Sequence, residues 1–191
     1  MSACRRIIRR TCSLVLLAAL LAWAVIAYNR LVRLRNQVAT AWADIDVQLQ
    51  RRHDLVPQLV AAVRGYAAHE GAVLEAVTAL RTRALGLRDP GELGEVEAEL
   101  EQALGRVLLL REAYPELKAS ENFAALQDDL VDVEEQLQFA RRYYNGAVRD
   151  FNDTVQSVPD VLVARSFGFA AAAFFQAGAE SRAAPQVDIA G

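Results

Sequence analysis

Beyond the first thirty residues, apolar side chains recur along the chain at alternating intervals of three and four positions. This period is close to one turn of an α-helix, and the strict alternation that a strand would need does not occur past residue 30. Four such stripes follow one another, and they run from Leu31 to Leu49, from Leu59 to Leu80, from Leu93 to Tyr114 and from Phe123 to Val155. The pattern predicts an all-α body, in which Leu130 and Leu137 of the fourth stripe face the interior.

Turn signals separate most of the stripes. Residues 89–91, Asp-Pro-Gly, lie between the second and third stripes; Pro115 ends the third, Ser120 is placed to cap the fourth, and Pro159 ends it. Four segments of similar length bury their stripes best as an antiparallel bundle with the spacing of a coiled coil. We therefore expect an antiparallel four-helix bundle of long helices.

One boundary, between the first and second stripes, is less sharply marked. Only residues 51–57 offer a break there, with Asp54 as an N-cap and Pro57 in the first turn of the second helix. Because no glycine marks a reversal, a single kinked helix through this segment is the alternative.

An uncharged stretch precedes the stripes. Residues 11–29 carry no charge, and residues 12–28 are almost wholly apolar. These seventeen positions span about 25 Å as a helix, the short end of what a bilayer core needs. A cleaved signal peptide with a site after Ala24 and a buried core helix are two alternatives. Because the run continues past Ala24 to Tyr28, we expect an uncleaved transmembrane anchor.

Charge is unevenly distributed along the chain. The net charge is −3, yet four arginines precede the apolar run and leave 17 basic against 24 acidic residues downstream. An acidic body argues against nucleic acid as a partner. Because three further arginines follow the run closely, the count only slightly favours a cytoplasmic N-terminus with the body outside.

Residues suited to catalysis are few. Both cysteines lie within the first twelve residues, and the only histidines are His53 and His69. Neither histidine has the companions that a zinc protease or a di-iron bundle needs, so we expect both at the surface or satisfied near helix ends. The sequence predicts no enzyme, no metal and no cofactor. A carboxylate–metal enzyme built on Glu70 or Glu134 is the weakest of three functional hypotheses.

Two basic segments invite a functional interpretation. Their charged side chains could hold a carboxylate or phosphate of a partner protein, and the candidate partner-binding residues are Arg51, Arg52, Asp54, Arg141 and Arg142. We expect instead a solvated helix end at Arg51 and Arg52, together with arginine stems along the bundle whose heads lie in water.

An aromatic tail follows the fourth stripe. It contains Phe167, Phe169, Phe174 and Phe175 among alanines and glycines. Because exposed phenylalanines are costly, we expect this tail to dock as a cap on the end of the bundle, with a membrane surface or a protein partner as the alternatives. Its last part has no periodicity and is expected to be disordered.

Short motifs in a fixed order resemble one family. They are residues 28–36, 41–49 (AWADIDVQL), 51–57 (RRHDLVP), 65–70 (GYAAHE), 112–119 (EAYPELKA) and 140–148 (ARRYYNGAV). Over roughly residues 28–175 the chain resembles the LemA family of bacterial membrane-anchored proteins. The resemblance implies one transmembrane helix and a helical bundle, and it implies no enzyme, because the family has no established catalytic residues. Gln58, Val158 and residues 170–173 depart from the family pattern.

These features divide the chain into a basic segment 1–11, a transmembrane anchor 12–28, a helical bundle 29–165 and a tail 166–191. The first hypothesis is a single-pass, non-catalytic scaffold or adaptor of the bacterial cell envelope, held in the bilayer by residues 12–28 and bound to another envelope protein. The second is a homo-oligomer that organises membrane through lateral association of its helices.

Overall fold

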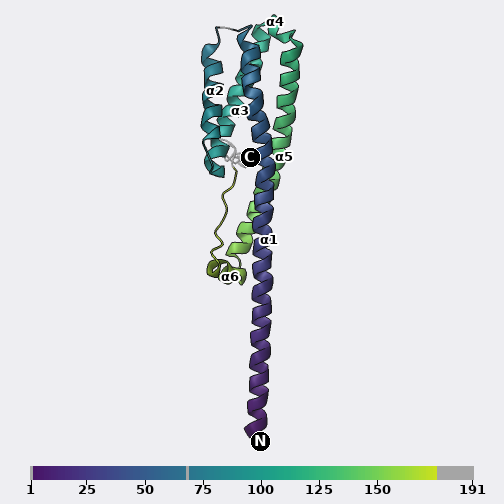
Figure 1. The fold of residues 1–191 in the computed structure, drawn as a ribbon, viewed down its shortest axis with the longest axis vertical. Coiled ribbons are helices and arrows are strands. Elements are labelled where there is room, and N and C mark those ends of the chain that lie inside the picture. Colours follow the sequence, from purple (N-terminus) through teal and green to yellow (C-terminus); the bar gives the residue numbers. More distant parts are fainter. Residues whose placement is uncertain (1, 68, 176–191) are drawn as a thin grey trace, which may run out of the picture. The chain divides into compact units, whose positions relative to one another are not determined.

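The structure is a computed structural model that describes residues 2–67 and 69–175, with side chains from residue 14 onward. Helices follow one another along the chain (Figure 1), and their bounds are α1 Ser2–Arg64, α2 Gly71–Leu85, α3 Pro90–Ala113, α4 Pro115–Lys118, α5 Glu121–Gln156 and α6 Asp160–Ser166. No strand occurs among the described residues, and the prediction of an all-α fold is confirmed. Residues 176–191, which include the last part of the tail that is expected to be disordered, lie outside them.

The chain separates into two compact units. The first comprises Met1–Ala41 and Gly146–Ala172, and the second comprises Trp42–Asn145 and the chain from Ala173 onward. Each unit has its own apolar cluster and is described separately.

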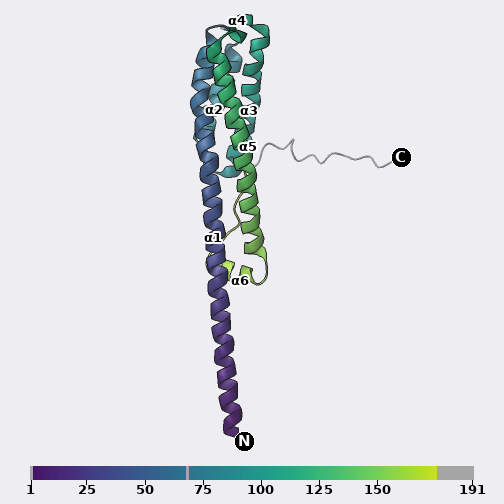
Figure 2. The same ribbon diagram turned by 90° about the vertical axis from the view of Figure 1, so that its right-hand side faces the viewer.

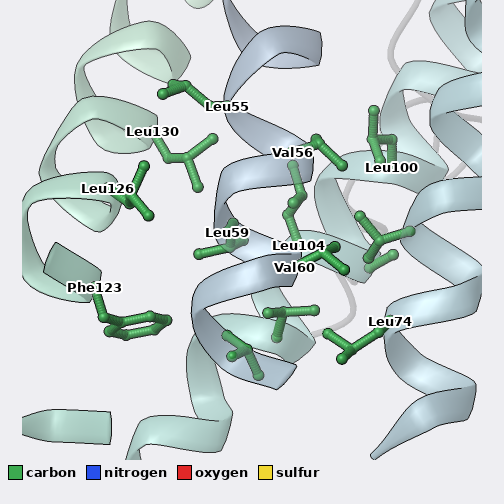
Figure 3. Packing of buried hydrophobic residues seen from close by; sticks show 14 of the residues in the cluster. Leu55, Val56, Leu59, Val60, Leu74, Leu100, Leu104, Phe123, Leu126 and Leu130 are labelled. Carbon is green, nitrogen blue, oxygen red and sulfur yellow. The ribbon is translucent and has the colours of Figure 1, made fainter. Parts of the chain in front are cut away.

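Four long helices supply the core of the second unit. Its cluster draws Leu55, Val56, Leu59, Val60 and Val63 from α1, Leu74 and Val77 from α2, Leu100, Leu104 and Val107 from α3, and Phe123, Leu126 and Leu130 from α5. In Figure 3 the α1 side chains lie between those of α5 on one side and those of α2 and α3 on the other. Leu130 and Leu137 are 7% and 0% exposed, so their predicted interior position is confirmed.

The predicted helix boundary at residues 51–57, with Asp54 as an N-cap, is wrong, because α1 continues through Pro57 to Arg64. A proline has no N–H for the carbonyl four residues before it, which here is that of His53. This carbonyl instead accepts a hydrogen bond from Nε of Arg81 in α2, at 2.6 Å. The backbone group that Pro57 leaves free is therefore satisfied, and the helix does not need to end.

The chain reverses after Arg64, so the second stripe is divided between α1 and α2. The N–H of Ala67 donates to the carbonyl of Val63 at 2.9 Å, and Ala67 itself is fully buried. The turn thus closes with an α-helical bond and an apolar contact. It holds no proline, and its first residue, Gly65, lies outside the break predicted at residues 51–57.

The other predicted turns are confirmed. The Asp89 carboxylate accepts from the N–H groups of Gly91 and Glu92 at 2.9 and 3.0 Å, and Pro90 opens α3 at a position where a missing N–H costs nothing. The hydroxyl of Ser120 accepts from the Phe123 N–H at 3.4 Å at the start of α5.

The first unit has a smaller core. Its cluster joins Ala27 and Leu31 of α1, Phe151 and Val155 of α5, and Val163 and Ala164 of α6. Figures 1 and 2 both show α6 beside α1.

Ahead of that cluster, α1 carries a stretch long and apolar enough to cross a membrane. An 18-residue window has a mean hydropathy of 1.9, and 11% of it is buried. A core helix would be mostly buried, whereas the large side chains from Leu14 to Ile26 are 55–67% exposed, apart from Trp23. This stretch supports membrane association.

Candidate functional site

A cluster of charged side chains lies inside the second unit. Arg52 of α1 and Glu97 of α3 are 2% and 0% exposed, and Nη1 of Arg52 donates to Oε2 of Glu97 at 3.1 Å. Nε2 of the adjacent His53, also buried, lies 2.6 Å from Oε1 of Glu97. Each oxygen of the Glu97 carboxylate therefore has its own partner on α1. Because an unpaired charge at this depth is strongly destabilising, these contacts fix the alignment of α1 and α3.

The fifth helix completes the ion pairing of Arg52. Nη2 of Arg52 donates to Oε2 of Glu134, a half-buried residue of α5. The other oxygen of Glu134 accepts from Nε2 of Gln138 at 2.7 Å, one turn further along α5. One guanidinium thus bridges carboxylates from two helices, and α1, α3 and α5 share one polar network.

A second arginine, Arg141 of α5, is buried near this network. It is 8% exposed, and among the described residues its Nε and Nη2 have no hydrogen-bond partner. Its guanidinium lies 5.4 Å from the ring centre of Phe175, within the range of a cation–π contact. Burial lowers the pKa of Arg141, while the negative charges of Glu101 and Glu97 oppose that change.

The same forces act on Arg52. Burial lowers the pKa of Arg52, whereas Coulomb attraction to Glu97 and Glu101 and the hydrogen bond to Glu97 raise it; repulsion from Arg141 lowers it further. The two arginines that the sequence singled out in separate motifs therefore lie close enough to influence each other. The charge of Arg52 is paired with Glu97 and Glu134, whereas Arg141 feels the negative charges of Glu101 and Glu97 without an ion pair among the described residues.

Two surface expectations are corrected by this burial. Arg52 does not lie on a solvated helix end, and the head of Arg141 is not in water. Glu134 is half-buried and is engaged by Arg52. His53 is satisfied, as expected, but in the middle of α1 and not near a helix end.

The other three candidate partner-binding residues are exposed. Arg51 forms surface ion pairs with Asp132 and Asp129 of α5, at 3.1 and 3.7 Å. Asp54 accepts from Gln50 within α1. Arg142 lies over the ring of Phe139, 4.7 Å from its centre.

A shallow groove of about 390 Å³ lies between α1 and α5 in the second unit. It is lined by Asp44, Val47 and Gln48 from α1 and by Gln136, Phe139, Ala140 and Tyr143 from α5. Val47, Phe139 and Tyr143 are 63%, 61% and 49% exposed. The exposed aromatic rings and the stacked Arg142 are residue types that protein interfaces favour.

The tail docks through backbone hydrogen bonds that the apolar pattern did not foretell. In the second unit, the Asn145 side chain both donates to the carbonyl and accepts from the N–H of Phe175, at 2.9 and 3.0 Å. The Tyr144 hydroxyl donates to the Ala173 carbonyl at 2.8 Å. Phe175 is fully buried and packs edge-on against Trp42, at 5.8 Å between ring centres.

A matching arrangement occurs in the first unit. Asn152 donates to the carbonyl and accepts from the N–H of Ala172, at 3.0 and 2.8 Å. Phe169 packs on Phe151, with ring centres 6.5 Å apart. The tail therefore lies along helices, not over the end of a bundle as expected; Phe174 is half-buried and Phe167 is 63% exposed.

The residues of the weakest hypothesis are engaged by protein groups. Oε1 of Glu70 accepts from the Tyr114 hydroxyl at 3.2 Å, and Glu134 pairs with Arg52. His69 is exposed. Within residues 14–67 and 69–175, no group of three or more His, Cys, Asp or Glu side chains is arranged to hold a metal ion.

Comparison with known proteins gives a consistent result. A family model described as "LemA family" matches residues 41–189. The chain is 24% identical to magnetosome protein MamQ 2 of Paramagnetospirillum magneticum, over 86% of this chain and 70% of that protein. It is 22% identical to magnetosome protein MamQ of Magnetospirillum gryphiswaldense over 85% and 70%, and 24% identical to protein LemA of Metamycoplasma hominis over 78% and 68%.

Proposed function

The chain belongs to the LemA family, and from this premise we propose that it is a membrane-anchored, non-catalytic scaffold or adaptor of the bacterial cell envelope. The observation that carries the proposal is the composition of α1. Its first part is an exposed apolar stretch of membrane-spanning length, and its last part supplies Leu55 to Val63 to the core of the second unit. One helix thus serves as both anchor and core element.

The body of this scaffold is an antiparallel four-helix bundle built from α1, α2, α3 and α5. The apolar cluster common to these four helices and the tight turn at Asp89 support this arrangement. The buried arginines support a non-catalytic role, since Arg52 is bound by protein carboxylates and is not directed at a substrate.

A partner is proposed to dock in the groove between α1 and α5. The occupant would be an apolar segment of another envelope protein, which would cover Phe139 and Tyr143. Removing such exposed rings from water contributes roughly 25 cal/mol for each Å² buried. Arg142, held over Phe139, would stand at the edge of the contact.

Site-specific photocrosslinking in living cells tests this proposal. The full chain would carry p-benzoylphenylalanine at Tyr143, and a matched chain would carry it at Leu109, an α3 residue that is 67% exposed. We expect a discrete heterologous adduct from Tyr143 only, and its loss in Phe139→Ala. The same adducts from both positions, or an adduct unaffected by Phe139→Ala, would contradict the docking site.

The same experiment separates the two non-catalytic hypotheses. An adduct of twice the chain's own mass that contains only this chain would favour the homo-oligomer that organises membrane. A heterologous adduct favours the adaptor.

The orientation is proposed to be N-terminus inside and body outside. In a chain whose two cysteines are replaced by serine, Leu109→Cys should react with a membrane-impermeant maleimide in spheroplasts. Reaction only after lysis would place the body in the cytoplasm.

A further inference from the structure

Three exposed apolar side chains gather around α6 in the first unit. Val158, which precedes the helix, is 84% exposed, Leu162 within it is 61% exposed, and Phe167 directly after it is 63% exposed. Exposure of several neighbouring apolar side chains to water is energetically unfavourable, and such apolar patches commonly mark a surface that contacts a protein or a membrane. We call Val158, Leu162 and Phe167 the α6 patch.

The α6 patch is held against the end of the apolar stretch of α1. The ring of Phe167 lies 4.8 Å from that of Tyr28, and Asp160 of α6 pairs with Arg30 at 3.3 Å. On the inner face of α6, Val163 and Ala164 are buried in the cluster of the first unit. Within this unit, α6 is therefore fixed to α1 at residues 28–30, with its apolar outer side chains left open.

The contact at Tyr28 has a consequence for depth in a bilayer. Ile26, only two residues earlier, is 65% exposed and belongs to the apolar stretch. Two residues correspond to about 3 Å along a helix axis. If lipid surrounds Ile26, the lipid therefore extends along the helix axis to within a few Å of the level of Phe167, which packs on Tyr28.

The length of the apolar run points in the same direction. Residues 12–28 would span about 25 Å, whereas a bilayer core is about 30 Å thick. A span that is short by roughly 5 Å draws the residues that flank it toward the lipid or thins the bilayer locally. The α6 patch places apolar side chains among those flanking residues, at the body end of the run.

The charged residues nearby fit an interface with lipid headgroups. Arg33, Arg35 and Arg165 are exposed in the same unit, and the guanidinium of Arg35 lies 5.3 Å from the centre of the Phe169 ring. Aromatic and arginine side chains are characteristic of the membrane–water boundary.

We propose that the α6 patch contacts the bilayer surface, where Val158, Leu162 and Phe167 enter the boundary between headgroups and acyl chains and form a second membrane contact beside the span. This contact rests on the membrane anchoring proposed above. The body would then contact the membrane at a second site beside α1, whereas a protein held by a single helix contacts it only through that helix.

Nitroxide depth measurements on the full chain test this inference. The two native cysteines are replaced by serine, and single labels are placed at Leu20→Cys, Leu162→Cys and Leu109→Cys. Each protein is reconstituted in vesicles of phosphatidylethanolamine and phosphatidylglycerol, and the accessibility of the label to oxygen and to a water-soluble nickel chelate is measured. Leu20 serves as the lipid reference and Leu109 as the aqueous reference.

We expect the oxygen-to-nickel accessibility ratio at Leu162 to lie severalfold above that at Leu109 and below that at Leu20. If Leu20 reports lipid while Leu162 matches Leu109, the α6 contact is wrong although the anchor stands. If Leu20 itself reports water, the anchoring fails. A Leu162 label shielded from both reagents would mean that protein covers the patch, which also overturns the proposal.

Bilayer thickness provides a second, independent arm. Bilayers of dimyristoleoylphosphatidylcholine are thinner than bilayers of dierucoylphosphatidylcholine. In the thinner bilayer the oxygen-to-nickel accessibility ratio at Leu162 should be lower than in the thicker one, while the ratio at Leu109 stays unchanged. An identical ratio at Leu162 in both bilayers would refute the argument from span length.

Discussion

Replacing Glu97 by leucine should be among the most damaging single changes in the second unit. The substitution removes the carboxylate that pairs with Arg52 at 3.1 Å and with His53 at 2.6 Å. All three side chains are buried, so no water can replace the lost oxygens without opening the core. Among the described residues, half-buried Glu134 would be left as the only carboxylate bound to Arg52.

The magnitude follows from these contacts. Hydrogen bonds to charged groups contribute about 1.5–3 kcal/mol each, and breaking a buried ion pair by removal of one partner costs about 3–5 kcal/mol. We expect Glu97→Leu to lower the free energy of unfolding by about 3–5 kcal/mol, which for a chain of this length corresponds to a fall in Tm of roughly 6–20 °C. Circular dichroism melting of the detergent-solubilised full chain would measure it.

Two companion variants test the cause. Glu99 lies on the same helix, is exposed, and pairs with exposed Arg83 at 3.5 Å, so Glu99→Leu should cost at most about 1 kcal/mol. The double variant Arg52→Met with Glu97→Leu removes both buried charges and should recover much of the loss. The reasoning would be refuted if Glu97→Leu melted like Glu99→Leu, or if the double variant were less stable than Glu97→Leu alone.

Three further outcomes can be measured with urea. Leu137→Ala, at a fully buried position, should lower the free energy of unfolding by about 2–5 kcal/mol, against a few tenths for exposed Leu109→Ala; equal effects would mean that the helix phase is wrong. Asp89→Ala removes two bonds to the start of α3 and should cost about 0.5–2 kcal/mol, an effect that Asp89→Asn should largely avoid. Burial, together with the negative charge of Asp89, raises the pKa of the Tyr144 hydroxyl in the folded protein. The unfolded state therefore loses the hydroxyl proton first, and the free energy of unfolding falls as pH rises above about 10. Tyr144→Phe should make that fall shallower, and an unchanged slope would contradict this prediction.

The apolar pattern was enough to predict the helices and most of their turns, because burial of a stripe and capping of a helix end are local in sequence. It failed where the satisfying group is distant. Pro57 looked like a helix start, since nothing nearby indicated that Arg81 would take up the free carbonyl of His53. The first reversal was placed wrongly because the break was sought at Pro57, whereas the chain turns after Arg64, where the Ala67 N–H bonds to the Val63 carbonyl.

The tail shows the same limit. Its phenylalanines predicted docking, but the docking contacts are made largely by the side-chain amides of Asn145 and Asn152, which pair with the backbone of Phe175 and Ala172. A side-chain amide can bond to the backbone of any residue, so this contact requires no hydrophobic periodicity in the tail. Hydrophobic spacing therefore could not reveal where the tail lies.

The buried charges did leave a signal in the sequence. Leu49, Arg52, Val56 and Leu59 follow one another at intervals of three and four, so Arg52 occupies a stripe position. Glu97 does the same between Leu93 and Leu100, and Arg141 between Leu137 and Tyr144. A charged residue is usually assigned to the surface even in such a position, because charged side chains are rarely buried without an opposite charge. Here the opposite charge comes from another helix, and Arg52 and Glu97 are 45 residues apart in the sequence.

The buried charges in the stripes also determine how the helices align along their axes, which the apolar residues alone do not. Leucines and valines repeated every three or four positions would pack almost as well if one helix slid by two turns against its neighbour. Such a slide would separate Arg52 from Glu97 and leave both buried without a partner, at a cost of about 3–5 kcal/mol. The ion network therefore selects one alignment of α1, α3 and α5. Arg52 lies in one of the motifs that carry the LemA resemblance, so that resemblance rests in part on a residue that sets the packing of the helices.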